Sequence, residues 1–148
     1  MVDISIVERE MTATELDQMN AGFDENSVDH DVAVQTSERF GYVAVDGDQF
    51  IGCSSGLAYK NGDAFSGWFY LTDLYVEKVF RKLGLGAKLL RALEETIAAH
   101  GVTKIWTWTA GYEAPGFYKK QGYEVFAELE GWYSDGSNRV GLRKVLSR

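Results

Sequence analysis

A basic, glycine-bearing segment, Arg81-Lys82-Leu83-Gly84-Leu85-Gly86, occurs where the sequence predicts that a strand runs into a helix. The first backbone N–H groups of a helix have no partners within it, and the helix dipole adds a potential that favours anions. Gly84 and Gly86 leave room for a phosphate to approach these N–H groups, and Arg81 and Lys82 add positive charge. The pattern predicts an anion site, although Gly-x-Gly taken alone equally describes a tight turn.

Two familiar phosphate-binding motifs do not describe this segment. A dinucleotide-binding motif would need a third glycine at the position of Leu89, and a P-loop would need a Gly-Lys-Ser/Thr sequence that the chain lacks. A different way of holding phosphate is therefore expected.

Hydrophobic periodicity indicates which elements position this turn. Alternating, β-branched or aromatic stretches predict strands, and apolar residues at every third or fourth position predict helices. In chain order we expect a strand at 4–8, a helix from Thr12, strands at 40–45, 49–59 and 65–76, a helix at 84–100, a strand at 103–109, a short helix at 115–122, and strands at 123–128 and 139–146. A helix between strands 65–76 and 103–109 requires a parallel pair. The predicted fold class is α/β, with a mixed sheet and helices on both faces.

Local signals mark the two ends of the first helix. Thr12 and Glu15 have the three-residue spacing of a capping box. The polar run Asp24-Glu25-Asn26-Ser27 is expected to end or bend this helix.

Length and composition restrict the class of protein. The chain has 148 residues, of which 45% are hydrophobic and 25% charged, and one globular domain over residues 1–148 is expected. The single cysteine, Cys53, cannot form an intramolecular disulfide, and no segment predicts a membrane helix. We therefore expect a soluble, cytoplasmic protein. His30 and His100 are isolated, so no metal site is predicted.

The net charge of −7 argues against binding to nucleic acid, which depends on Lys and Arg neutralising phosphates. Residues 1–80 carry 15 acidic and 4 basic side chains, and residues 81–148 carry 7 acidic and 11 basic ones. This division suits a protein that holds an anionic cofactor with its C-terminal half and attracts a cationic acceptor with its N-terminal half. An ordinary solvated surface is the simpler explanation.

From about residue 40 to residue 146 the sequence resembles the GNAT superfamily of N-acetyltransferases. The family signature Arg/Gln-x-x-Gly-x-Gly/Ala is matched by Arg81, Gly84 and Gly86. Residues 70–76, Tyr-Leu-Thr-Asp-Leu-Tyr-Val, resemble the preceding strand, most closely that of the diamine and polyamine acetyltransferase branch. Residues 114–123 resemble the family's Ala-x-x-Phe-Tyr-x-x-x-Gly-Phe/Tyr helix.

The resemblance implies a site for acetyl-coenzyme A. In such proteins the pyrophosphate lies on the loop equivalent to residues 81–86, and the pantetheine arm pairs like an added strand with the edge of residues 74–76. Splaying of that strand from residues 103–109 would open the cleft. The implied cofactor-binding residues are Leu74, Tyr75, Val76, Arg81, Lys82, Leu83, Gly84, Leu85, Gly86, Ala87, Phe117 and Lys120.

The resemblance also implies one catalytic residue, Tyr118, and Asp73 is the better placed of the candidates for the second, the base. A phenol is protonated at neutral pH, so Tyr118 suits the role of proton donor to the departing thiolate, with a core aromatic as the alternative. Many relatives have a glutamate base at the position of Thr72, and the base is therefore expected to be Asp73, Glu113 or water. Strand alternation places Asp73 and Thr72 on opposite faces. Gly111 stands where many relatives have an asparagine, so one cofactor contact is expected to be missing.

The predicted function is direct transfer of an acetyl group from acetyl-coenzyme A to a primary amine of a small molecule or peptide, in a ternary complex. We expect a cationic acceptor and, as in many relatives, a homodimer. The acidic residues expected to recruit the acceptor are Asp24, Glu25, Asp29 and Asp31, and the aromatic residues that could line its pocket are Trp68, Tyr70, Trp108 and Trp132. The alternative is a non-catalytic module that binds acetyl-coenzyme A as a sensor or regulator.

Overall fold

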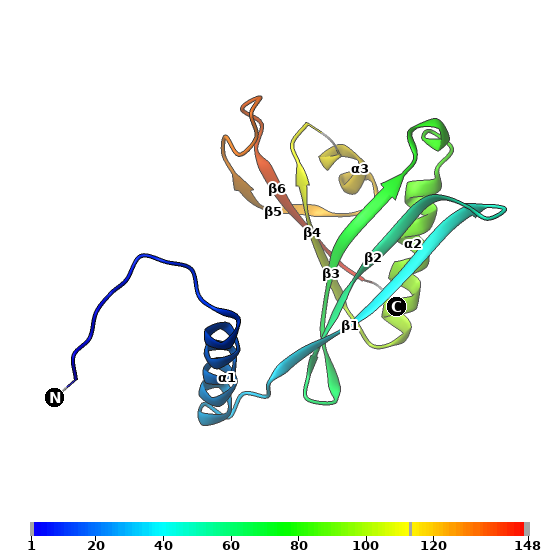
Figure 1. Ribbon diagram of the computed structural model, residues 1–148. Helices are drawn as coiled ribbons and strands as arrows, with labels where there is room; N and C mark the ends of the chain where they lie inside the picture. Colours follow the sequence, from blue (N-terminus) through cyan, green and yellow to red (C-terminus); the bar gives the residue numbers. More distant parts are fainter. Residues whose placement is uncertain (1, 113, 147–148) are drawn as a thin grey trace. The chain divides into compact units, whose positions relative to one another are not determined.

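The computed structural model describes residues 2–112 and 114–146, and it divides into two compact units, residues 2–34 and residues 35–146 (Figure 1). The expectation that residues 1–148 form one domain stays a prediction. None of the helices in the described ranges has the length and apolar composition that a membrane crossing requires.

The first unit contains one helix, α1 (Ala13–Asp29), whose start confirms the predicted capping box. The backbone N–H of Glu15 donates to Thr12 Oγ1 at 3.2 Å, and Glu15 Oε1 accepts from the Thr12 N–H at 2.8 Å. The Arg9 guanidinium, 2.7 Å away, lowers the pKa of the Glu15 carboxyl to about 2. These local bonds fix the N-terminus of α1 without any buried side chain.

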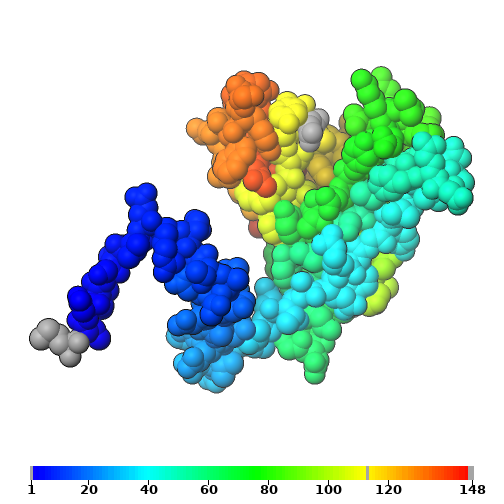
Figure 2. All heavy atoms as spheres, viewed as in Figure 1, coloured from blue at the N-terminus to red at the C-terminus, as the bar shows by residue number. Residues whose placement is uncertain are grey.

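Two predictions for the first unit are wrong. Residues 4–8 form no strand and belong to an extended stretch (Figure 2), because a strand needs a pairing partner and none of the described strands provides one. The helix also continues through the polar run 24–27 and ends only at His30. Polar side chains can stay solvated on an exposed helix, and the change in backbone direction comes later, at Asp31, which has a φ of 58°.

The second unit is built on a six-stranded sheet in the order β1-β2-β3-β4-β6-β5. Its strands are β1 (Gln35–Asp46), β2 (Gln49–Asn61), β3 (Ala64–Val76), β4 (Lys104–Ala110), β5 (Glu124–Leu129) and β6 (Arg139–Val145). The hairpin between β1 and β2 turns at Gly47, which has a φ of 59°. Only β3 and β4 pair in parallel, as the intervening helix requires. The predicted mixed α/β class is confirmed.

The two helices of the second unit cover one face of this sheet. Helix α2 (Leu85–Ala99) buries a stripe of leucines, Leu89, Leu90 and Leu93, together with Ile97, and α3 (Pro115–Lys120) buries Tyr118. Both helices join one apolar core, whose fully buried members include Phe69, Leu71, Leu93, Ile97, Ile105 and Leu142. The prediction of helices on both faces also included the first helix of the chain, and it stays a prediction. The other face of the sheet carries the aromatic side chains of alternate residues, such as Trp68 and Trp106.

Two hydrogen bonds to one glutamate connect α2 to Tyr123, just before β5, and to Lys144 of β6. Glu94 of α2 accepts a hydrogen bond from the Tyr123 hydroxyl at 2.7 Å and an ion-paired bond from Lys144 Nζ at 2.9 Å. Burial and the Glu94 charge raise the pKa of Tyr123 well above its ordinary value, so the phenol stays protonated and donates. The contact satisfies a carboxylate that is mostly shielded from water.

Candidate cofactor and acceptor site

The predicted phosphate turn follows β3 directly. After Val76 the chain makes a short 3₁₀ turn, η1 (Lys78–Phe80), and Arg81 then reaches back so that its Nε donates to the Val76 carbonyl oxygen at 2.9 Å. Gly84 is the N-cap of α2 in the left-handed region, with a φ of 77°, and no side chain caps this end. The N–H groups of the first helical turn thus face the predicted anion site.

The space around the two glycines fits an anion. A Cβ added at Gly84 would meet nothing within 4 Å, and one added at Gly86 would meet only the ring of Phe117, at 3.6 Å. Phe117 of α3 therefore lies beside the turn, and its contact with the cofactor stays a prediction. Leu83 is 62% exposed, and Lys120 is exposed near the C-terminal end of α3.

Strands β3 and β4 pair over only three residues each, Trp68–Tyr70 with Lys104–Trp106. Beyond this point the two strands diverge (Figure 1), which agrees with the predicted splay. Thr107 is the first residue of β4 after the paired segment. Its hydroxyl donates to the Leu71 carbonyl oxygen at 2.9 Å, so a side chain supplies the hydrogen bond to β3 where backbone pairing stops. Residues 74–76 consequently pair with β2 on one edge and with no described strand on the other.

A β-bulge places Thr72 and Asp73 together. In the β2–β3 register Ser55 is opposite Asp73 and Gly56 is opposite Leu71, so Thr72 is the extra residue. Thr72 Oγ1 lies 2.8 Å from Asp73 Oδ2. The prediction that these side chains occupy opposite faces is wrong, because the extra residue interrupts the strand alternation on which it relied.

The paired strands β1 and β2 contribute two further polar side chains next to Thr72 and Asp73. We call the four residues Arg39, Ser55, Thr72 and Asp73 the polar cluster. Arg39 Nη2 donates to Ser55 Oγ at 3.0 Å and to Thr72 Oγ1 at 3.3 Å, and it lies 3.9 Å from Asp73 Oδ2. Arg39 and Ser55 were not predicted as site residues. No motif marks them, since only the register of β1 and β2 brings them beside Thr72.

Tyr118 lies in the core at 6% exposure. Its ring packs edge-on against Phe117, at 5.3 Å between centroids, and against Tyr123, at 5.4 Å. The residue before it in α3, Phe117, is the one whose ring lies beside Gly86. The proton-donor role stays a prediction, and the alternative base Glu113 lies outside the described residues.

The surroundings of Cys53 and His100 indicate structural roles for these residues. Burial raises the pKa of the Cys53 thiol, which disfavours the nucleophilic thiolate. His100 packs against Phe40 at 4.8 Å, and its Nδ1 lies 2.9 Å from the Thr96 carbonyl oxygen. Within residues 2–112 and 114–146, no group of three or more His, Cys, Asp or Glu side chains is arranged to hold a metal ion.

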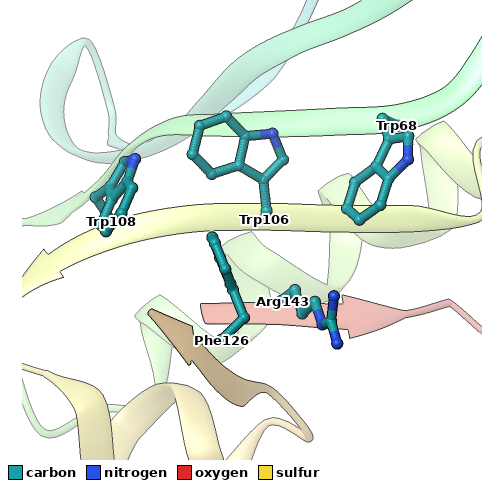
Figure 3. A pocket seen from close by; sticks show the side chains of 5 residues that line it. All are labelled: Trp68, Trp106, Trp108, Phe126 and Arg143. Atoms are coloured by element: carbon teal, nitrogen blue, oxygen red, sulfur yellow. The ribbon is translucent and has the colours of Figure 1, made fainter. Parts of the chain in front are cut away.

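The aromatic face of the sheet carries a hollow of about 400 Å³ (Figure 3). It is lined by Trp68, Trp106, Trp108, Phe126 and Arg143, which we call the aromatic pocket. Trp68 and Trp108 were predicted to line a pocket, whereas Trp106, Phe126 and Arg143 were not. The alternation of tryptophans along β4 was the available signal for Trp106.

The other two predicted aromatic residues lie beside the pocket without lining it. Tyr70 stacks on Trp106 with ring centroids 4.2 Å apart, and Trp132 packs beneath the Arg139 guanidinium at 5.2 Å. The pocket therefore begins where β3 and β4 still pair and reaches Trp108, beyond their last paired residues.

Comparison with known proteins identifies the family. The model of the GNAT acetyltransferase domain matches residues 37–125, which include both the turn and α3. YyaT of Bacillus subtilis, described only as uncharacterized, is 32% identical over 78 residues, which are 53% of this chain and 51% of YyaT. The matched region thus spans about half the length of this relative.

Solved structures share the fold at lower identity. An acetyltransferase from Bacillus cereus has a TM-score of 0.77 at 20% identity and covers 96% of this chain and 98% of its own. An aminoglycoside 6'-N-acetyltransferase complexed with coenzyme A has a TM-score of 0.62 at 23% identity, over 75% and 74% of the two chains. The Escherichia coli ribosomal-protein-S18-alanine N-acetyltransferase has a TM-score of 0.63 at 16% identity, over 74% and 70%. The match of the family model over more than half of its residues shows that this chain belongs to the GNAT family of acetyltransferases.

Proposed function

We propose that this protein transfers the acetyl group of acetyl-coenzyme A directly to a primary amine of a small molecule or peptide. The observation that carries the proposal is the continuity of three features: an unpaired β3 edge, the glycine turn that follows it, and the α3 residues beside that turn. A bound thioester would lie along one path from the turn to the polar cluster.

The cofactor-binding residues are proposed from this path. The N–H groups of Leu85, Gly86 and Ala87 would hold the pyrophosphate, with charge from Arg81 and Lys82. The edge of residues 74–76 would pair with the pantetheine arm, and Leu83, Phe117 and Lys120 would flank the two ends of the cofactor. The coenzyme A complex of the aminoglycoside acetyltransferase, a protein of this fold, supports the assignment.

The chemistry requires a neutral amine and a protonated leaving group. Acetyl-coenzyme A supplies the activated acetyl carbonyl when it is bound. Asp73 would accept the amine proton, and the 2.8 Å contact of its carboxylate with the Thr72 hydroxyl at the β3 bulge supports this role. Tyr118 would donate the proton to the thiolate, and holding both reactants in one cleft removes the need for a covalent acyl-enzyme.

The experiment combines cofactor binding with turnover. Calorimetric titration with acetyl-coenzyme A tests the cofactor site, and thiol release with a panel of amines, lysine peptides and polyamines tests transfer. Tyr118→Phe should lower kcat by about 10²-fold or more while the acetyl-coenzyme A Kd stays within about twofold, as for loss of a general acid. Tyr123→Phe, which removes another buried phenol that donates to Glu94, is the matched control.

The outcomes separate the function from its alternatives. Cofactor binding without turnover of any amine would refute the enzyme and support a sensor module. Absence of binding would refute the cofactor site itself. Turnover of polyamines in the same panel would support the proposed membership of the diamine and polyamine acetyltransferase branch. Sedimentation of the same samples tests the predicted homodimer.

A further inference from the structure

The aromatic pocket has an unusual charge environment for a site that is to receive an amine. Three of its rings already face a cation of the protein itself. Lys104 Nζ lies 5.1 Å from the Trp68 ring, the Arg139 guanidinium 5.4 Å from Trp108, and the Arg143 guanidinium 5.9 Å from Phe126. None of the five lining residues is acidic.

These contacts decide which ligands the pocket favours. A ring attracts a cation through its negative face, but a face that already carries a lysine or arginine has little attraction left for a second cation. The nearby positive charges would also repel an added ammonium group. A flat, uncharged ring can still meet Trp106 edge-on, in the way that the Trp108 ring does at 6.2 Å.

Arg143 supplies a partner for an anionic group. It is the one charged residue that lines the pocket, and Figure 3 shows its guanidinium beside the row of aromatic rings. Its Nε donates to Glu124 Oε1 at 3.1 Å, in a pair whose side chains are 52% and 70% exposed. Exposed pairs of this kind contribute little stability, so a ligand carboxylate can compete for the guanidinium.

We propose that the aromatic pocket is the acceptor subsite for an aromatic amine that also carries a carboxylate, with the ring against Trp106 and the carboxylate at Arg143. This inference rests on the proposed function and names its substrate class. Along β3, Trp68 and Tyr70 lead on the same face to Thr72 of the polar cluster, so the amine of such a ligand would point toward Asp73. The proposal departs from a purely cationic acceptor, which was predicted from the acidic residues of the N-terminal unit.

Three matched ligands test the proposal without requiring acetyl transfer. The full chain is titrated calorimetrically, in the absence of acetyl-coenzyme A, with 3-phenylpropionate, 3-phenylpropylamine and 3-cyclohexylpropionate. We expect 3-phenylpropionate to bind about tenfold more tightly than the amine, because like charges placed together are penalised. It should also bind more tightly than the cyclohexyl acid, whose puckered ring cannot stack.

Two variants test which residue binds the carboxylate of the ligand and which residue binds its ring. Arg143→Gln should abolish the preference for the acid over the amine, and Trp106→Leu should weaken the two aromatic ligands while leaving the cyclohexyl acid within about twofold. Arg91→Gln, on the outer surface of α2, is the control for lost charge. Equal or tighter binding of the amine would overturn the proposal. Binding of none of the three would overturn it too, in favour of a protein segment as the occupant, and neither result would affect the acetyl-coenzyme A titration.

Discussion

The two halves of β3 differ in what surrounds them. Residues 64–71 are paired on both edges where β4 reaches them, and they supply Phe69 and Leu71 to the core at 0% and 1% exposure. Residues 72–76 begin with the bulge residue Thr72, pair from Asp73 onward with β2 and with no other described strand, and lead into the glycine turn. One strand thus changes from a doubly paired, buried element to an edge that is open for the proposed cofactor.

The difference teaches that the opening of the site is built from small local devices. The bulge at Thr72 turns two consecutive side chains toward one cluster, and the Thr107 hydroxyl satisfies the Leu71 carbonyl where the ladder stops. Neither device needs a flexible loop. Substitutions in the first half should therefore affect stability, and those in or next to the second half should affect binding or turnover.

The largest effect is expected in the paired half. Phe69→Ala should lower the free energy of unfolding by about 3–5 kcal/mol, because it empties a fully buried site. Trp68→Ala, on the half-buried aromatic face next to it, should cost only about 1–2 kcal/mol. Urea denaturation measures both, and equal losses would show that the two faces of this half are not energetically distinct.

A loss of cofactor affinity is expected next, at the turn that follows the open half. Gly86→Glu should weaken acetyl-coenzyme A binding by about 100-fold or more, because it places a negative charge where the helix N-terminus would hold the pyrophosphate. Gly86→Gln adds similar bulk without the charge and should lose less. Calorimetry gives both affinities, and a folded Gly86→Glu variant with unchanged affinity would disprove the assigned phosphate site.

The boundary between the halves should show an intermediate effect on stability. Thr107→Val keeps the shape of the side chain but leaves the buried Leu71 carbonyl without its donor, which should cost about 1–3 kcal/mol. Thr107→Ser retains the hydroxyl and should recover much of that loss. Thermal and urea denaturation measure the stability of both variants. If Thr107→Val leaves the free energy of unfolding unchanged, the Leu71 carbonyl must find another donor.

The smallest effect is expected at Arg39, which acts on the open half through other side chains. Arg39→Gln should lower kcat/KM by about threefold at unchanged acetyl-coenzyme A affinity, since exposed ion pairs contribute up to about 1 kcal/mol. Lys60→Gln removes a different ion pair, between Lys60 of β2 and Glu38 of β1, and should leave kcat/KM unaltered. Similar losses in both variants would remove Arg39 from the site.

Features encoded within one element were predictable from the sequence. The capping box at Thr12, the leucine stripe of α2 and the strand-turn-helix order at Gly84 each depend on neighbours a few residues away. The strand predicted at 4–8 failed because alternation specifies a face but not a partner.

The parts of the site that escaped prediction depend on contacts between strands. The face of Asp73 follows from a bulge that exists only in register with β2, and Arg39 reaches Thr72 across β2 from β1. Phe126 and Arg143 join the tryptophans because β6 lies between β4 and β5, an order that a chain read from end to end does not reveal.

The half-paired β3 strand has a consequence for handling the protein. An open strand edge exposes backbone N–H and C=O groups that can template association with another chain. A pantetheine arm paired along residues 74–76 would occupy those groups. Saturation with coenzyme A is therefore expected to suppress aggregation on concentration or mild heating, beyond the stabilisation that any bound ligand provides.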